Sequence, residues 1–382
     1  MNSPMDTSLT SPVTGLPYPD FFKPIIANPD VAGMVYMTRE EQVAAEARAY
    51  KGEHTIKGSE TDPWEHGGSA IVIPVDVQTG FGADPNLMFN QTAGGLQLPW
   101  KPQGGSLFVP GAPMDTFRLC KFIMDNLPMI GTIDPSMDTH QTFQIFHADS
   151  WIGFSTGEAP PAFTVIVPTG RGLVGMHPDG SQDTYSHISD PAKALRYCQI
   201  LAEKGASPLT IWPYHCRIGS TQHPLMPLLS EVQLFHDIAR RADNSVDIKG
   251  FETMTESYGI VGDEVGEIDG EKVGTEERSG YIDKLLDYKA IIIAGQASSH
   301  CVRATINQIK THLAARNPGL VKRIWVLRDA MSPVPAIPGF ENDPDSPLNF
   351  PAVAEASFRQ WEAEGLHVVA TTDNFLAEAL NA

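Results

Sequence analysis

Cysteine is scarce in this 382-residue chain, with only Cys120, Cys198, Cys216 and Cys301. None of them forms a close C-x-x-C pair, and their spacing does not suggest a disulfide framework. The chain is also long enough to bury a substantial core without disulfides or a structural metal. We therefore expect free thiols and a reducing compartment, the cytoplasm.

Long apolar runs and positive charge are lacking as well. No continuous apolar span is long enough for a membrane helix, and the start "MNSPMDTSLTSPV" has neither a basic nor an apolar signal region. Lysine and arginine number 27 against 46 aspartates and glutamates, a net charge of −19. Such a chain repels phosphate backbones, so we expect neither nucleic acid nor membrane as a partner.

Turn-forming residues are plentiful and unevenly distributed, with 33 glycines and 31 prolines. Residues 1–65 are rich in them and in charge, and they predict an N-terminal extension that packs on the body or on a neighbouring subunit. One helix is expected there, over 38–51, with Thr38 as its cap and Glu41 three positions later. The body spans 66–382. Within it, 150–208 shows little strand signal and is interpreted as an insertion with one helix near its end.

Six short apolar runs predict the central sheet of the body, and helical patterns separate most of them. The runs are continuous rather than alternating, which is typical of parallel strands covered on both faces. We expect an α/β fold: a three-layer, doubly wound, mainly parallel sheet of about six strands with helices on both faces. The expected strands are 69–76, 129–140, 245–250, 290–296, 323–330 and 366–373, and the expected helices are 114–127, 190–205, 228–242, 280–289 and 301–316.

Four polar or reactive residues stand at or just beyond the ends of these strands: Asp76, Asp138, Lys249 and Cys301. Ligands of open α/β sheets bind beyond the carboxyl ends of the strands. The shared placement of these four residues therefore predicts a functional site at that edge of the sheet.

Cys301 begins a helix directly after the apolar strand "AIIIAGQ". The free N–H groups there favour an anion, so they are expected to lower the thiol pKa and to bind a developing oxyanion. A small buried core residue is the alternative. As base for the thiol we expect Asp76, whose pKa apolar neighbours would raise, with Lys249 holding the charges. His300 is adjacent on the helix and is expected to form a pocket wall or cap instead.

A second polar group predicts a metal site. Asp138 and His140 stand two residues apart on an extended segment and so point to the same side, and "IWPYHC" adds His215. One carboxylate and two imidazoles suit Zn²⁺, with Fe²⁺ or Mn²⁺ as alternatives. His147 and His223 are spare candidates. A purely structural role remains open for each histidine.

Three stretches of the sequence resemble the cysteine-hydrolase branch of the isochorismatase-like family, and most closely nicotinamidases. They are "VDVQTGF" (75–81), "DIKGFETMTESYG" (247–259) and "AGQASSHCV" (294–302), within a resemblance that covers roughly 69–380. It implies a catalytic triad of Asp76, Lys249 and Cys301, with Lys272 as a rival for the lysine. It also implies a cis peptide at Gln296–Ala297 and an oxyanion hole from the N–H groups of Ala297 and Cys301.

The resemblance further implies the substrate and the assembly. The D-x-H pair and the histidine of "WPYHC" match the metal ligands of nicotinamidases, which implies hydrolysis of nicotinamide to nicotinate through a cysteine thioester in a homo-oligomer. Phe81, Trp151 and Phe154, with His300, are candidates for the substrate pocket, and core packing is the alternative for the aromatic three. Alternatives are another amidase acting on a carbamoyl, ureido or maleamate-type substrate, a vinyl-ether hydrolase, or a non-catalytic binding protein. The string "MDTH" (137–140) departs from the family pattern and leaves the substrate more open than the triad.

Overall fold

The fold was analysed in a computed structural model that describes residues 9–54, 70–86, 92–93, 96–97, 104–242, 245–275 and 277–381. The first eight residues and residues 55–65 of the expected extension lie outside the described ranges. Among the described residues, no helix is both long and apolar enough to cross a membrane.

A parallel sheet forms the centre of the molecule, and five of the six predicted strands pair in it, whereas the strand predicted at 245–250 belongs to a separate two-stranded sheet. Five strands pair in the order β16–β15–β14–β1–β4, and beyond β4 the chain continues into β5, which pairs in parallel with β11. The bounds are β1 Ala70–Val75, β4 Ile130–Ile133, β5 Ser136–Asp138, β11 Asp247–Lys249, β14 Ala290–Gly295, β15 Ile324–Leu327 and β16 His367–Val369. β1 and β14 are buried at every position, which explains their continuous apolar sequences.

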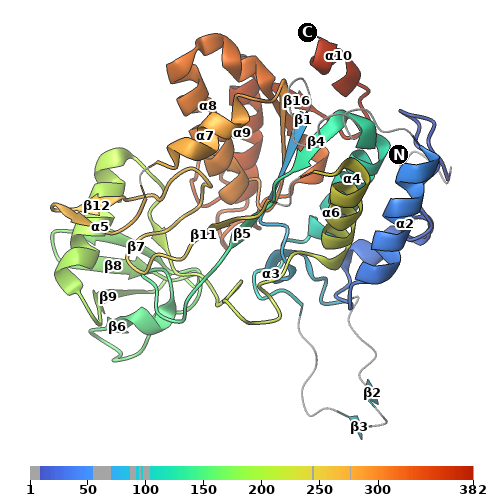
Figure 1. Ribbon diagram of the computed structural model, residues 1–382. Helices are drawn as coiled ribbons and strands as arrows, with labels where there is room; N and C mark the ends of the chain where they lie inside the picture. Colours follow the sequence, from blue (N-terminus) through green and yellow to red (C-terminus); the bar gives the residue numbers. More distant parts are fainter. Residues whose placement is uncertain are drawn as a thin grey trace.

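Helices cover both faces of this sheet, as predicted (Figure 1). One face carries α4 (Ala112–Asp125) and α6 (Pro227–Arg240), and the other carries α7 (Ser279–Leu285), α8 (Cys301–Arg316) and α9 (Phe350–Ala363). Their apolar faces meet the strands in one continuous hydrophobic core. Helix α9 had no counterpart among the predicted helices.

A second, antiparallel sheet occupies much of the segment from 150 to 210, where the sequence showed little strand signal. Its strands run in the order β10–β7–β8–β9–β6, and α5 (Pro191–Lys204), the one helix expected there, packs against them. They are β6 Trp151–Gly153, β7 Val165–Thr169, β8 Gly172–Met176, β9 Gln182–His187 and β10 Leu209–Thr210. These strands are short, and Pro168 and Gly175 interrupt two of them, so no apolar pattern extends over more than a few residues.

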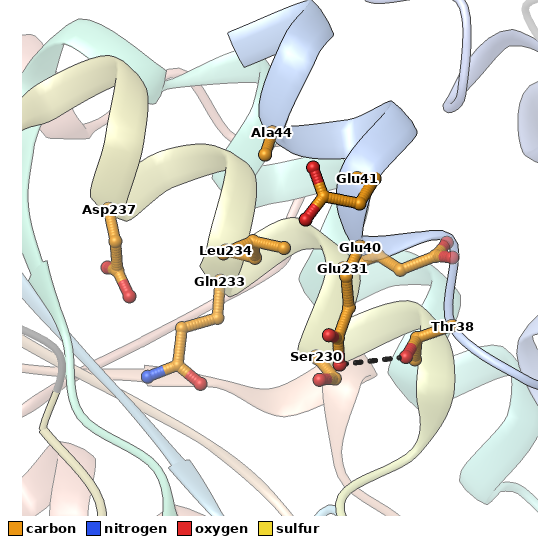
Figure 2. Close-up of a pocket in the computed structure, with 9 residues that line it drawn as sticks. All are labelled: Thr38, Glu40, Glu41, Ala44, Ser230, Glu231, Gln233, Leu234 and Asp237. Carbon is orange, nitrogen blue, oxygen red and sulfur yellow. Dashed lines mark hydrogen bonds between the residues drawn. The ribbon is translucent and has the colours of Figure 1, made fainter. Parts of the chain in front are cut away.

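The N-terminal arm packs on α6 through α2 (Glu40–Glu53). Thr38 does not cap this helix. Arg39 occupies the cap position, and no side chain accepts a hydrogen bond there. Instead the backbone N–H and the guanidinium of Arg39 both donate to the buried Glu231 of α6, the guanidinium at 2.6 Å, which fixes the start of the helix from outside. The two helices border an acidic pocket of about 390 Å³. Its lining includes Glu40, Glu41, Glu231 and Asp237 (Figure 2).

The remaining described elements are short. They are α1 Lys23–Ala27, α3 Thr79–Gly82, α10 Leu376–Asn381, β2 Thr92–Ala93, β3 Leu96–Gln97, β12 Glu267–Ile268 and β13 Glu271–Lys272, with 3₁₀ turns at Pro29–Gly33, Leu127–Met129, Ala148–Ser150, Pro318–Arg323 and Arg328–Ala330.

Candidate active site

Asp76 stands where β1 ends, in a left-handed backbone conformation with φ of 48°. Its backbone N–H donates to the carbonyl of Ser136, and the Ser136 hydroxyl donates to its carboxylate over 2.6 Å. A non-glycine residue rarely adopts this conformation, and neighbouring contacts must hold it there. The result is a fully buried carboxylate fixed at the carboxyl end of the central sheet.

Lys249, the last residue of β11, joins two carboxylates inside the protein. Its Nζ lies 2.8 Å from Oδ2 of Asp76 and 3.1 Å from Oδ1 of Asp138, and it donates to the carbonyl of Ser257 over 2.9 Å. Burial lowers the pKa of this ammonium, but the carboxylates of Asp138 and Asp76 outweigh burial and raise the pKa well above its usual value. Lys249 is therefore charged.

Cys301 is the first residue of α8 and completes this group. Its Sγ lies 3.7 Å from Lys249 Nζ, and the carboxylates of Asp76 and Asp138 each place an oxygen within 4.8 Å of the sulfur. The loop before it contains the cis peptide Gln296–Ala297, as the family resemblance implies. Gly295 is required here, because a Cβ would lie 2.1 Å from the carbonyl oxygen of Val75. Three residues far apart in the sequence thus meet at one sheet edge.

The acidity of the thiol differs from the expectation. Burial raises the pKa of Cys301 well above its usual value, and the Lys249 ammonium offsets this only in part. The position at a helix start does not compensate for the loss of water. Burial likewise raises the pKa of Asp76 despite Lys249, as predicted. The resting site therefore holds a protonated thiol beside a carboxyl group that readily takes up a proton.

Asp138, His140 and His215 form a second buried group. His140 Nε2 lies 3.0 Å from Oδ2 of Asp138 and 3.2 Å from Nε2 of His215, and His215 Nε2 lies 3.7 Å from the same oxygen. Ligands of a tetrahedral zinc ion, at about 2.0–2.2 Å from the metal, stand about 3.3–3.6 Å apart. The spacing of the three atoms therefore suits a divalent ion bound between them.

The outer nitrogens of both histidines support the same interpretation. Nδ1 of His140 lies 3.1 Å from the carbonyl of Gly250, and Nδ1 of His215 lies 2.7 Å from the carbonyl of Pro213. A carbonyl only accepts, so each Nδ1 carries a proton, and in the neutral imidazole each Nε2 then presents a lone pair. Two lone pairs and a carboxylate oxygen then converge, and a bound cation satisfies all three.

A narrow cavity connects the two groups. It is lined by Phe81, Leu107, Asp138, Trp212, His215, Glu256, Tyr258, Ala297, His300, Cys301 and Val334. Its volume is about 20 Å³, room for about one water, so a substrate must be small and must part these side chains to enter. Both sulfur and metal-ligand atoms border the space, so one small molecule can contact both.

Several residues of the cavity wall were not predicted from the sequence. Glu256 is buried, and burial raises its pKa to about 7 although His140 opposes this. Glu256 and Tyr258 lie in an irregular loop, and Trp212 lies within the quoted stretch "IWPYHC" but was not singled out there. None of them belongs to a periodic pattern, so the quoted stretches "DIKGFETMTESYG" and "IWPYHC" were the only available signal.

His300 and Phe81 both line the cavity. The Phe81 ring meets His215 edge to face, with the ring centroids 5.3 Å apart. His300 precedes α8, and burial, with Arg303 adding to it, lowers the pKa of its imidazole to about 3, so the ring is neutral. It packs edge to face against Trp212 and Phe350, which hold its orientation.

The other candidates lie elsewhere. Trp151, expected in the pocket, is absent from its walls: it is buried in the small sheet, where its indole N–H donates to the carbonyl of Ile145. Phe154 is 73% exposed, and Lys272 lies in the exposed β13. His147 packs edge to face against His140 without joining the three metal-capable residues, and His223 is within hydrogen-bonding distance of the Thr139 hydroxyl.

Comparisons with known proteins give only distant similarities. No protein-family model and no curated protein matches the sequence. Among solved structures, the yeast nicotinamidase aligns with a TM-score of 0.45 and 18% identity, over 78% of this chain and 99% of that one. A nicotinamidase/pyrazinamidase of Acinetobacter baumannii gives 0.41 and 16%, over 80% and 97%. The zinc complex of a Pyrococcus horikoshii pyrazinamidase gives 0.38 and 15%, over 79% and 99%. At these values the similarity assigns no function to this chain.

Proposed function

We propose that this protein is a cysteine-dependent amidohydrolase that converts a small carboxamide, nicotinamide in the first instance, to its acid and ammonia. The main support for this proposal is the buried group in which Lys249 Nζ lies 2.8 Å from the Asp76 carboxylate and 3.7 Å from the Cys301 sulfur. A nucleophile, a base and a fixed positive charge within reach of one another are what acyl transfer requires.

The first half of the reaction forms a thioester. Asp76 takes the thiol proton of Cys301 while the sulfur attacks the amide carbon, and the carbonyl electrons move to oxygen. The N–H groups of Ala297 and Cys301 stabilise this oxyanion. When the carbon–nitrogen bond breaks, Asp76 returns the proton to the departing nitrogen and ammonia leaves.

The second half reverses the roles. Asp76 takes a proton from a water molecule, whose oxygen attacks the thioester carbon, and breaking the carbon–sulfur bond returns that proton to sulfur. Lys249 keeps its charge throughout, so it stabilises the carboxylate in one step and the sulfur in the next.

Asp138, His140 and His215 would hold a divalent metal, with Zn²⁺ best suited to their donor set. Such an ion supplies a Lewis-acid position that can hold the ring nitrogen of a pyridine or a water molecule. Because two of these ligands line the same cavity as Cys301, a ring held there would turn its carboxamide toward the sulfur.

The cavity walls distinguish among amides. Among the described residues that line it, none is arginine or lysine, whereas Asp138 and Glu256 are acidic. A maleamate-type substrate would bring a carboxylate into this space without a cationic side chain in the wall to pair with it. The aromatic and apolar walls instead favour an uncharged, flat amide.

His300 adds a directed polar group. The Ser299 hydroxyl accepts from the N–H of Val334 and lies 2.8 Å from His300 Nδ1. Among the described residues that hydroxyl has no other acceptor, so it donates to Nδ1, and the proton of the neutral imidazole resides on Nε2. This leaves an N–H donor on a ring that lines the cavity, which suits a substrate oxygen or ring nitrogen.

The deciding experiment measures ammonia release from nicotinamide by the full-length protein, by Cys301→Ala, and by the wild type after chelator treatment. We expect turnover in the wild type, a loss of about a thousandfold or more in Cys301→Ala, and reduced turnover after chelation that zinc restores. Cys198→Ala, in α5, is the matched control and keeps activity. A Cys301→Ala variant that releases ammonia at the wild-type rate would exclude this nucleophile, and failure on nicotinamide with success on another amide would correct only the substrate.

A further inference from the structure

A further pocket lies at the opposite end of the central sheet from Cys301. Lys289 directly precedes β14, Arg323 directly precedes β15, and His367 begins β16. Because these strands are parallel, their amino ends share one edge, away from Cys301 at the carboxyl end. The pocket has a volume of about 470 Å³, within the range of small-molecule sites, and is lined by Lys289, Lys322, Arg323, Trp325, His367, Glu378 and Ala379.

Unneutralised positive charge distinguishes this pocket. Within the part of the chain that the structure describes, Lys289, Lys322 and Arg323 have no carboxylate within 4.0 Å. These three cations lie together in a protein whose net charge is −19. Glu378 is the one acidic residue in the wall. Three convergent cations with a single carboxylate leave a local positive potential that attracts anions.

The guanidinium of Arg323 is already oriented. Its Nη1 donates to the carbonyls of Leu286 and Tyr288, over 3.0 and 3.2 Å. The remaining N–H groups, on Nε and Nη2, have no acceptor among the described residues and form the edge that binds an oxyanion through two parallel bonds. Lys289 donates one of its three protons to the carbonyl of Leu380, over 2.8 Å. The backbone therefore holds both cations while leaving donors for a ligand.

Aromatic stacking makes one wall rigid. The ring of Trp325 lies between His367 and Phe375, with centroid distances of 3.9 and 4.5 Å and nearly parallel planes. A wall that cannot rearrange preserves the pocket without a ligand and lowers the entropic cost of binding. The indole also provides a fluorescence signal for occupancy.

We propose that this pocket binds a small anion that carries phosphate or carboxylate groups, at a site separate from the catalytic one. The combination of one fixed arginine, two lysines and a rigid aromatic wall recognises oxyanions by charge and geometry. Both classes of anion offer the paired oxygens that the Arg323 edge fits, and the experiment separates them.

The test titrates the full-length protein with inorganic phosphate and, separately, with succinate, following heat and tryptophan fluorescence. At low ionic strength we expect a dissociation constant of about 1 mM or tighter for at least one anion, weakened by added salt. Arg323→Gln and Lys322→Gln should each weaken binding about tenfold. Lys310→Gln, which removes a cation paired with Glu364 elsewhere, is the matched control and should bind normally. Trp325→Phe should retain the heat and lose the fluorescence change.

The outcomes are separable from folding and from catalysis. Among the described residues, the side chain of Lys322 makes no hydrogen bond or ion pair, so Lys322→Gln should leave the stability unchanged. It therefore tests the site even if Arg323→Gln destabilises the protein by removing the hydrogen bonds from Arg323 to backbone carbonyls. Absence of heat with both anions, or equal affinity in wild type and Lys322→Gln and Arg323→Gln, would overturn the proposal. Ammonia release plays no part in the measurement, so failure of the amidase proposal leaves this result unaffected.

Discussion

Lys249 and Asp138 form a buried ion pair in which the ammonium contacts Oδ1 of the carboxylate at 3.1 Å. The other oxygen of that carboxylate, Oδ2, faces His140 and His215. One side chain thus connects the group around Cys301 with the metal-capable group. The two groups should therefore fail together when Asp138 is changed.

Asp138→Asn replaces the shared carboxylate by a neutral amide of the same shape. We expect zinc affinity to fall by about a hundredfold or more, because a charged ligand is lost, and turnover to fall with it. Zinc content after equilibration with limiting metal, measured beside ammonia release, gives both values. His223→Gln is the control, since His223 contacts Thr139 and no ligand atom, and it should retain zinc. Unchanged zinc affinity in Asp138→Asn would remove Asp138 from the metal site.

Lys249→Met tests the charge balance of the site. Removing the ammonium leaves the fully buried Asp76 without its cation, and breaking a buried pair in this way costs about 3–5 kcal/mol. We expect a loss of that order in the free energy of unfolding, measured with urea, together with loss of turnover.

The double variant Asp76→Asn/Lys249→Met separates stability from catalysis. Asparagine tolerates the left-handed conformation of position 76 and removes one of the two carboxylates left without the ammonium, so part of the lost stability should return while Asp138 stays without Lys249. Activity should not return, because neither base nor ammonium remains. A double variant as unstable as Lys249→Met alone would show that the two side chains are not energetically coupled.

Gly250→Ala tests the packing behind the metal ligands. Gly250 has φ of +76°, and a Cβ there would lie 2.3 Å from Oδ1 of Asp138 and 3.0 Å from Cε1 of His140. Gly219 has the same φ with no atom within 4 Å of its Cβ position, so Gly219→Ala carries the same backbone strain without the contact. Gly219→Ala should lose about 1–2 kcal/mol of stability from the backbone strain alone, Gly250→Ala should lose more, and only Gly250→Ala should also lose zinc affinity and turnover. Equal zinc affinity in the two variants would contradict the placement of Asp138.

The ends of the strands could be predicted from the sequence, and several residues of the candidate site lie at these ends. Asp76, Lys249 and Cys301 were predicted together because continuous apolar runs mark buried parallel strands, whose carboxyl ends must share an edge. Glu256 lies in a loop whose path depends on tertiary contacts, so no periodic sequence pattern could predict its position in the cavity wall. The thiol pKa was predicted in the wrong direction, because the helix start is visible in the sequence and the depth of burial of Cys301 is not.

The antiparallel sheet around 151–210 was missed for a related reason. Its strands have two to six residues and obtain their stability from pairing and from packing against α5, so local sequence preference is weak. Trp151 was accordingly assigned to the pocket, since a large aromatic residue beside a polar loop gives the same local signal whether it faces a ligand or a core.

Asp115 gives a pH dependence that can be measured away from the metal ligands. Burial raises the pKa of this α4 carboxyl to about 6 from an ordinary 3.8, although the amide of Gln296 donates to it over 2.9 Å. The folded protein therefore binds the proton more tightly than the unfolded chain. Its free energy of unfolding should fall as the pH rises from about 4 through about 6, by at most about 3 kcal/mol from this group.

Asp115→Asn isolates that contribution, because the asparagine oxygen can still accept from Gln296 but does not ionise. Relative to the wild type, the variant should gain stability between pH 4 and pH 7, with the increase confined to the window between the two pKa values. Urea unfolding of both proteins across this range measures the difference, and other titrating groups cancel in it. A constant difference would show that Asp115 ionises alike in both states, and a difference that shrinks toward pH 7 would mean that the folded protein favours its charged form.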